Sequence, residues 1–150
     1  MTTPQVSEDD IVRQLATEIR ILEGSVNALQ SRLEIVRAAI SEVTVAHDTI
    51  AGLKLLQGGD SVLVPVGAGS YIRMSIADSK NLVMGIGAGA AMEKNVDSSV
   101  EDLKSRLQDL EKARTSIQQQ LEQTLGRYQQ DRDALEEILQ KRETSTKKAS

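Results

Sequence analysis

Two long segments of this chain carry the same heptad pattern of apolar residues, and this pattern restricts the possible folds more than any other feature. In the first segment, apolar residues recur at alternating steps of three and four, with one polar interruption at His47. The positions are Val12, Leu15, Ile19, Leu22, Val26, Leu29, Leu33, Val36, Ile40, Val43, His47 and Ile50. A sustained repeat of this kind is typical of a coiled-coil helix. It predicts one helix over residues 8–57, capped by Ser7 and stopped by Gly58-Gly59.

The second segment repeats this rhythm toward the C-terminus. Its positions are Val100, Leu103, Leu107, Leu110, Arg114, Ile117, Leu121, Thr124, Tyr128, Asp131, Leu135 and Ile138. They predict a helix over residues 97–141 with Ser98 and Glu101 as its capping box, and the short basic segment 142–150 is expected to be a disordered tail. The two apolar seams are equally long, about 57 Å each at the rise of an α-helix. Equal helices on either side of an insert predict an antiparallel helical hairpin.

The register of this hairpin follows if Ile50 faces Val100, because the two residue numbers in every layer then add up to 150. Most layers are apolar on both sides. Four layers pair an apolar residue with a polar or charged one: Ile19/Asp131, Val26/Thr124, Val36/Arg114 and His47/Leu103. A carboxylate without a partner in an apolar layer costs several kcal/mol. We therefore expect the Ile19/Asp131 layer to open. Gly24 and Gly126 lie level at outward positions, where they form either a flexible joint or a tolerated surface feature.

The insert between the helices changes from a helical period to a period of two. Ile72, Met74 and Ile76 share one face, as in a strand, and most of the chain's glycines fall between residues 58 and 89. Residues 61–94 therefore predict two β-hairpins, with strands near 62–66, 71–77, 82–86 and 90–94 and with hairpin turns at Gly67-Ala68-Gly69-Ser70 and Gly87-Ala88-Gly89. Two such hairpins have too few large side chains to be stable alone, and their open edges attract other chains. The predicted fold is α+β: a long antiparallel coiled coil joined by two small β-hairpins that assemble into a β-barrel between subunits.

Three short motifs resemble the double-hairpin region of archaeal prefoldin alpha-class subunits. They are Leu63-Val64-Pro65-Val66-Gly67-Ala68-Gly69-Ser70-Tyr71, Val83-Met84-Gly85-Ile86-Gly87-Ala88-Gly89 and Met92-Glu93-Lys94. The resemblance implies an ATP-independent hexameric chaperone of two alpha-class and four beta-class subunits. It also implies that the coiled-coil ends hold unfolded proteins and pass them to a group II chaperonin. Assembly roles are implied for the matching strand residues Val64, Val66, Tyr71, Ile72, Val83 and Ile86.

The client-binding residues have no motif to match, so they are predicted from the physics of the helix ends. The apolar side chains there are Ile11, Val12, Leu15, Ile19, Leu135, Ile138 and Leu139. Opening at Asp131 would leave them partly in water, where each could regain up to about 1.5–3 kcal/mol by contacting a client. The alternative is that they are ordinary seam residues. A separate alternative for the whole chain is a structural or scaffolding coiled-coil protein that uses its arm ends to bind one defined partner.

Several other functions are disfavoured by the composition. Aromatic residues make up 1% of the chain and cysteine is absent, which argues against base-stacking nucleic-acid binding and against thiolate metal sites. His47 is the only histidine, and no catalytic set or cofactor motif surrounds it; Gly85-Ile86-Gly87 imitates a nucleotide loop but has the context of a hairpin turn. No charge-free stretch approaches the roughly 20 residues of a membrane span. We expect a cytoplasmic protein without enzyme activity, cofactor or metal.

Overall fold

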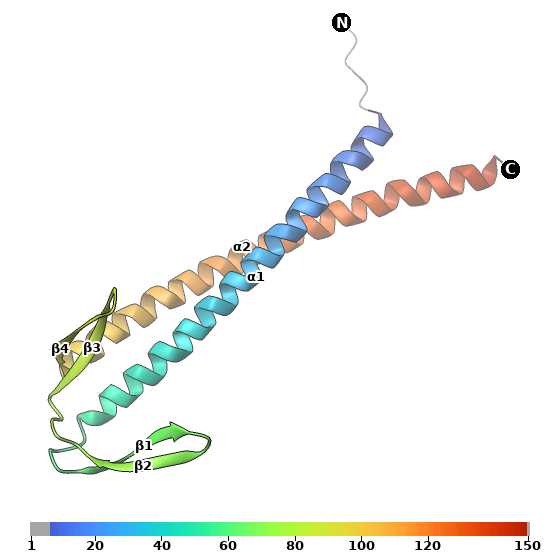
Figure 1. The fold of residues 1–150 in the computed structure, drawn as a ribbon. Helices are drawn as coiled ribbons and strands as arrows, with labels where there is room; N and C mark the ends of the chain where they lie inside the picture. The colour runs from blue at the N-terminus through green and yellow to red at the C-terminus, as the bar shows by residue number, and fades with distance from the viewer. Residues whose placement is uncertain (1–6, 150) are drawn as a thin grey trace, which may run out of the picture. The chain divides into compact units, whose positions relative to one another are not determined.

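The computed structural model describes residues 7–149 as two long helices with two β-hairpins between them in chain order (Figure 1). The elements are α1 (Glu8–Leu53), β1 (Ser61–Gly67), β2 (Ser70–Ser75), β3 (Asn81–Gly87), β4 (Ala90–Asn95) and α2 (Val96–Lys148). The predicted α+β class and the order of elements are confirmed. Each hairpin is a separate two-stranded sheet, so the barrel requires other chains.

Helix α1 begins at the predicted cap and ends earlier than the glycine pair suggested. The Asp10 amide donates to the Ser7 hydroxyl oxygen at 3.2 Å, and the hydroxyl donates to the Asp10 carboxylate. At the other end, the amides of residues 54–56 bond carbonyls three residues back, so the last turn tightens and α1 ends at Leu53 rather than at residue 57. The Gly59 amide then donates to the Ile76 carbonyl at 2.7 Å and leads the chain into the first hairpin.

Helix α2 is longer at both ends than the heptad pattern predicted. Asn95 caps its start by accepting from the Asp97 amide at 2.8 Å, a role that the sequence had suggested for Ser98. The helix continues to Lys148, so the expected disordered tail over 142–150 does not hold for residues 142–148; Ser150 lies outside the described residues. Two effects explain the difference. Arg142 forms ion pairs with α1, and two lysines in the last turn complement the negative end of the helix dipole.

The chain divides into two compact units. The arm unit combines the chain up to Val36 with the chain from Ala113 onward, and the hairpin unit comprises Arg37–Lys112. In both units, every predicted seam position is buried or half-buried. The best-buried apolar residues are Leu29 and Leu33 in the arm unit and Val43, Val96 and Val100 in the hairpin unit. The heptad assignment is therefore confirmed within each unit.

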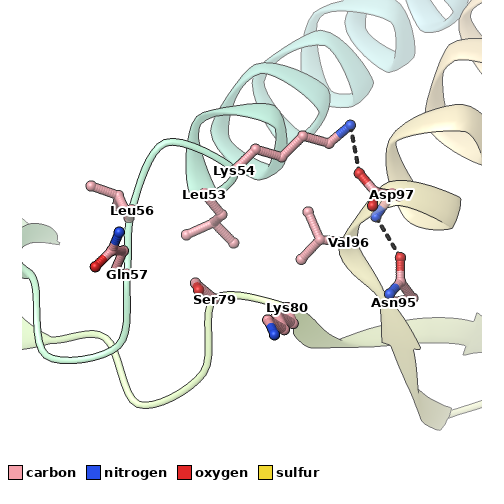
Figure 2. A pocket seen from close by; sticks show the side chains of 9 residues that line it. All are labelled: Leu53, Lys54, Leu56, Gln57, Ser79, Lys80, Asn95, Val96 and Asp97. Carbon is pink, nitrogen blue, oxygen red and sulfur yellow. Dashed lines mark hydrogen bonds and ion pairs between the residues drawn. The ribbon is translucent and has the colours of Figure 1, made fainter.

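One ion pair in each unit supports the predicted register. In the arm unit, Arg142 Nε lies 2.9 Å from Glu8 Oε1, and these residue numbers add up to 150. In the hairpin unit, Lys54 Nζ lies 2.8 Å from Asp97 Oδ1, one turn beyond the Ile50/Val100 layer (Figure 2). A shift of one heptad would separate either pair by about 10 Å.

The two hairpins repeat each other at an offset of 20 residues. Val64 pairs with Ile72 in the first and Met84 with Met92 in the second, and each ladder shifts register just before its turn. The turns have the same geometry: Gly67 and Gly87 have φ near +100°, and an alanine and a glycine with positive φ follow each of them. These turns agree with the predicted Gly-Ala-Gly segments.

Candidate functional site: hairpin faces and arm ends

The first hairpin exposes apolar side chains on both of its faces. The ladder register places Val64 beside Ile72 on one face and Pro65 beside Tyr71 on the other. Tyr71 is 62% exposed, and each residue of β2 is exposed to solvent. A sheet normally buries at least one face, and a lone two-stranded hairpin is marginal in water. This hairpin therefore lacks the cover that a stable sheet needs.

The second hairpin has the same deficit with a smaller apolar surface. Val83 is 74% exposed and Ile86 is 61% exposed, whereas Met84 is half-buried. Each hairpin consists of two edge strands, so backbone groups on both outer edges remain available for pairing. Strand addition by another chain would satisfy these groups, and the apolar faces would contribute hydrophobic burial.

All six residues predicted for assembly lie exposed in the hairpin unit, on β1, β2 and β3. Three further exposed apolar residues of the hairpins were given no assembly role from the sequence: Leu63, Met74 and Met92. The signal that could have found them is cross-strand pairing. Met74 lies opposite Val62 and Met92 lies opposite Met84, so each extends an apolar face that was already recognised.

The predicted client-binding residues gather at the ends of α1 and α2 in the arm unit. Ile11 and Leu139 are exposed, at 38% and 44%. The other five are half-buried along the seam: Val12, Leu15, Ile19, Leu135 and Ile138. None of the seven is buried. All seven apolar side chains at this end are therefore partly exposed to water, although five of them are seam residues.

The Ile19/Asp131 layer differs from the expectation that it would open. Both residues are half-buried, and Asp131 Oδ2 is shielded from solvent without a hydrogen-bond partner among the described residues. The neighbouring apolar layers hold the helices together at this level, so the carboxylate is enclosed rather than released. Such an oxygen costs about 1–3 kcal/mol relative to a satisfied one. The layer is closed but weakened.

Charge pairs beyond this layer tie the two helix ends to each other. Arg142 contacts both Glu8, at 2.9 Å, and Asp9, at 2.8 Å. These hydrogen bonds raise the pKa of Arg142, chiefly through Glu8. Lys141 pairs with Glu137 on its own helix at 2.7 Å, which lowers the pKa of the Glu137 carboxyl. The arm end is therefore a set of apolar side chains bordered by exposed, salt-sensitive ion pairs.

The hairpin unit contains a hollow of about 430 Å³ where the end of α1 meets the start of α2 (Figure 2). Leu53 and Val96 point toward each other across it, and the Val96 amide donates to the Lys80 carbonyl at 2.8 Å. Lys54 and Asp97 form the ion pair at its rim. Asp97 is the one carboxylate among the residues that line the hollow, and the contacts there join the ends of the two helices to the link between the hairpins.

No group of three or more histidine, aspartate or glutamate side chains is arranged to hold a metal within residues 7–149. Over the same residues, neither helix is long and apolar enough to cross a membrane. His47 lies half-buried in the seam and its Nδ1 is 3.0 Å from an Asp48 oxygen.

Comparison with known proteins places this architecture. A family profile described as Prefoldin subunit matches residues 22–148. The prefoldin alpha subunit of Methanopyrus kandleri is 36% identical over 110 residues, which are 73% of this chain and 70% of that protein. The prefoldin alpha subunit of Methanosarcina barkeri is 33% identical over 135 residues, 88% of this chain and 90% of that protein. A chain from the cryo-EM structure of filamentous PFD from Methanocaldococcus jannaschii covers 76% of this chain, with a TM-score of 0.63 and 19% identity, and 94% of that chain is matched.

The fold and its uncovered hairpins define a class: coiled-coil subunits whose β-hairpins are completed by other chains. Within that class, this chain belongs to the prefoldin family, and its archaeal relatives named above are alpha subunits. It is a prefoldin-type chaperone subunit, in a family that is not a known enzyme family.

Proposed function

We propose that this chain assembles with four beta-class subunits and a second alpha-class copy, without ATP or cofactor, in the cytoplasm. The assembled particle holds unfolded proteins at its arm ends and delivers them to a group II chaperonin. The observation that carries the proposal is the set of apolar side chains at the ends of α1 and α2, none of which is buried. They belong to both α1 and α2, so a client at one arm end can contact side chains of both helices.

Holding by these residues needs no nucleotide because it uses only apolar contact. One exposed side chain such as Leu139 contributes at most about 1.5–3 kcal/mol when a client covers it. A single arm therefore binds weakly and with little selectivity. Several arms on one particle raise the effective concentration of binding sites, and the combined affinity exceeds that of each arm. The exposed hairpins supply the assembly that this avidity requires.

Aggregation of a chemically denatured test protein is the direct test. The complex with a beta-class partner is expected to suppress aggregation without ATP. Replacing Ile11 and Leu139 with glutamine should weaken suppression, because both are exposed and lie beside the half-buried seam. The matched control is Leu125→Gln, since Leu125 is 41% exposed elsewhere in the arm unit. Equal suppression by the wild type, the double variant and the control would reject the arm ends as the holding site.

A second set of changes addresses the seam. Polar replacement of Val12, Leu15, Leu135 and Ile138 is expected to leave the particle mass unchanged, because the hairpins lie in the other unit. Suppression should fall further than in the variant of the exposed pair. Circular dichroism at the assay temperature would show whether the helices remain formed.

The second candidate function is a scaffold that binds one defined partner through the arm ends. The closed Ile19/Asp131 layer and the ion pairs of Arg142 favour it, because they leave a fixed surface. A chaperone should capture many unfolded chains and few native proteins, and a scaffold should do the reverse. Binding assays with the same test protein in native and denatured form separate the two functions.

A further inference from the structure

The outward surface of α1 in the arm unit carries, in addition to the seam, a stripe of small residues and two isoleucines without a charged side chain. Its residues recur at steps of four and three, so they lie on one face. They are Thr17, Ile21, Gly24, Ala28, Ser31 and Ile35, all exposed. Ile21 and Ile35 are 63% and 69% exposed. A heptad stripe of this kind is the pattern of a helix that packs against another helix.

The corresponding face of α2 is polar. Its residues in the arm unit are Ser116, Gln119, Gln123, Gly126, Gln130 and Asp133, all exposed. The seams of the two helices are equally long, yet only α1 has large apolar side chains, Ile21 and Ile35, on this outer face. Solubility of the arm would favour polar residues on both helices. The asymmetry therefore points to a partner for α1.

Gly24 lies near the middle of the stripe, and no contact within the chain requires a glycine there. A Cβ added at Gly24 would meet no atom within 4 Å. Glycine has no side chain, so the helix backbone is uncovered at this position. Gly24, Ala28 and Ser31 together form a shallow strip that another helix backbone could approach closely, with Ile21 and Ile35 projecting on either side.

We propose that this stripe pairs with the same stripe of a second copy of this chain, antiparallel and around a twofold axis. The axis lies midway between Gly24 and Ala28. In this register Gly24 faces Ala28 of the second copy, Ile21 faces Ser31, and Ile35 faces Thr17. Each layer is either small on both sides or combines one isoleucine with a smaller residue, so the backbones approach without gaps. A parallel pairing would instead stack Ile21 on Ile21 and Gly24 on Gly24, which leaves gaps at the glycines.

Charges beside the stripe select the same antiparallel register. Glu18 and Arg32 flank one edge, and Arg20 and Glu34 flank the other. In the proposed register, Glu18 faces Arg32 of the second copy and Arg20 faces Glu34 of the second copy, and the twofold axis repeats both pairs. Every flanking pair among these four residues then joins opposite charges. A shift of one heptad in either direction breaks most of these pairs.

The size of the stripe shows where this pairing operates. From Thr17 to Ile35 the helix is about 28 Å long, which gives roughly 300 Å² per copy. A stable dimer buries about 800 Å² per partner, so two isolated arms associate weakly. Two copies whose arms project in the same direction from one particle cannot form an antiparallel pair. The pairing therefore joins two particles through the two alpha-class arms of each, and it goes beyond the proposed holding function.

Charge reversal in the complex with a beta-class partner tests the proposal. Arg32→Glu places like charges in both symmetric contacts and should lower the association constant between particles about fivefold. Adding Glu18→Arg restores opposite charges in the reverse order and should return the constant to within about twofold of the wild type. Gln123→Glu on the outer face of α2 is the control without effect. Sedimentation velocity over a concentration series measures all four proteins.

Cysteine cross-linking tests the register, because the natural chain has no cysteine. A mixture of Ile21→Cys and Ser31→Cys chains should form the mixed disulfide, since these positions are level in the proposed pair. Disulfides between two identical chains should be rare, because each position is about 15 Å from its own copy along the axis, beyond disulfide reach. Gly24→Leu should abolish the cross-link, whereas Gly126→Leu on the other helix should not.

Three results would overturn the proposal. They are an unchanged association constant in Arg32→Glu, a charge-restored double variant that stays as weak as the single one, and a predominance of disulfides between identical chains. If replacing Ile21 and Ile35 with glutamine weakens aggregation suppression but not association, the stripe holds clients instead. Loss of suppression in the arm-end variants alone would bear on the proposed function and leave this pairing intact. The chain alone, measured in the same way, separates pairing from hairpin assembly.

Discussion

At the scale of single residues, the hairpin turns depend on glycines with positive φ. Gly67 has φ of +103°, a conformation that side chains with a Cβ rarely adopt. We expect Gly67→Ala to destabilise the first hairpin by about 1–2 kcal/mol because of backbone strain. Gly85→Ala is the matched control, since Gly85 lies in β3 without positive φ and with open space around its Cα. Thermal unfolding of the assembled particle should separate the two variants, and equal melting temperatures would contradict the strain argument.

The link between the hairpins contains a carboxylate whose titration is predictable. The Lys80 amide donates to Asp78 at 2.8 Å, and this bond, with those from Asn81, lowers the pKa of Asp78 below 3.8. Because the folded pKa is the lower one, the link is stabilised above pH 3.8 and loses this stabilisation as the pH falls through the folded value. The protection of the Lys80 and Asn81 amides against hydrogen exchange, expressed relative to the intrinsic rate at each pH, should fall there. In Asp78→Asn this pH dependence should disappear, and its persistence would assign the effect to another group.

Residue-level features were predictable where one residue type permits one geometry. The Gly-Ala-Gly turns and the Ser7 cap followed from the sequence, because glycine and short hydroxyl side chains have few competitors at those positions. The cap of α2 was assigned to Ser98 instead of Asn95, since both residue types cap helices and the choice depends on where the preceding strand ends. The closure of the Ile19/Asp131 layer was missed because a local penalty was weighed without the packing of adjacent layers.

At the scale of elements, the arm end is stabilised by one side chain that connects two helices. Arg142→Ala removes the ion pairs with Glu8 and Asp9, so hydrogen exchange should accelerate at both the start of α1 and the end of α2. Lys141→Ala is the control, because Lys141 pairs with Glu137 on its own helix, and its effect should be confined to α2. The wild-type protection should also fall at high salt. If the exchange of residues 8–12 did not respond to Arg142→Ala, these ion pairs would be unimportant in solution.

Helix identity was predictable from the heptads, and the helix ends were not. Every seam position from Val12 to Ile50 and from Val100 to Ile138 is buried or half-buried, because a repeat sustained over many turns has a single geometric explanation. The ends depend on local hydrogen bonds that compete closely. Residues 54–56 form a tight turn, whereas residues 142–148 continue the helix after an ion pair formed by residues 134 positions apart. A sequence pattern does not encode that competition.

At the scale of the whole molecule, the uncovered hairpins predict dependence on other chains. Replacing Tyr71 and Val83 with serine should reduce the mass of the complex with a beta-class partner, because both side chains are more than half exposed and lose apolar surface without a change in the fold. The helical signal in circular dichroism should remain, since neither residue lies in the seam. Leu125→Ser in the arm unit is the control and should leave the mass unchanged. Light scattering gives the mass, and an unaltered mass in the double variant would exclude these faces from assembly.

The architecture of one chain was predictable to a greater extent than its assembly. Helix, two hairpins and helix followed from a change in period at Tyr71–Ile76 and from clustered glycines. The barrel between subunits was inferred from the open strand edges, but its subunit ratio was inferred only through the resemblance to prefoldin, because the groups that satisfy the strand edges of β1 to β4 belong to other chains. The residues of one sequence specify which edges are open, and the partner's residues specify what closes them.

The offset of 20 residues between the two hairpins has a consequence for growth and termination. If each β-hairpin joins the chain to one neighbour, a chain with two hairpins acts like a bifunctional monomer in a polymer. A chain with one hairpin then acts like an end group. The ratio of the two kinds of chain then determines whether a closed particle or an extended polymer forms. Excess of the double-hairpin chain should favour elongation, and excess of a single-hairpin chain should favour small closed species.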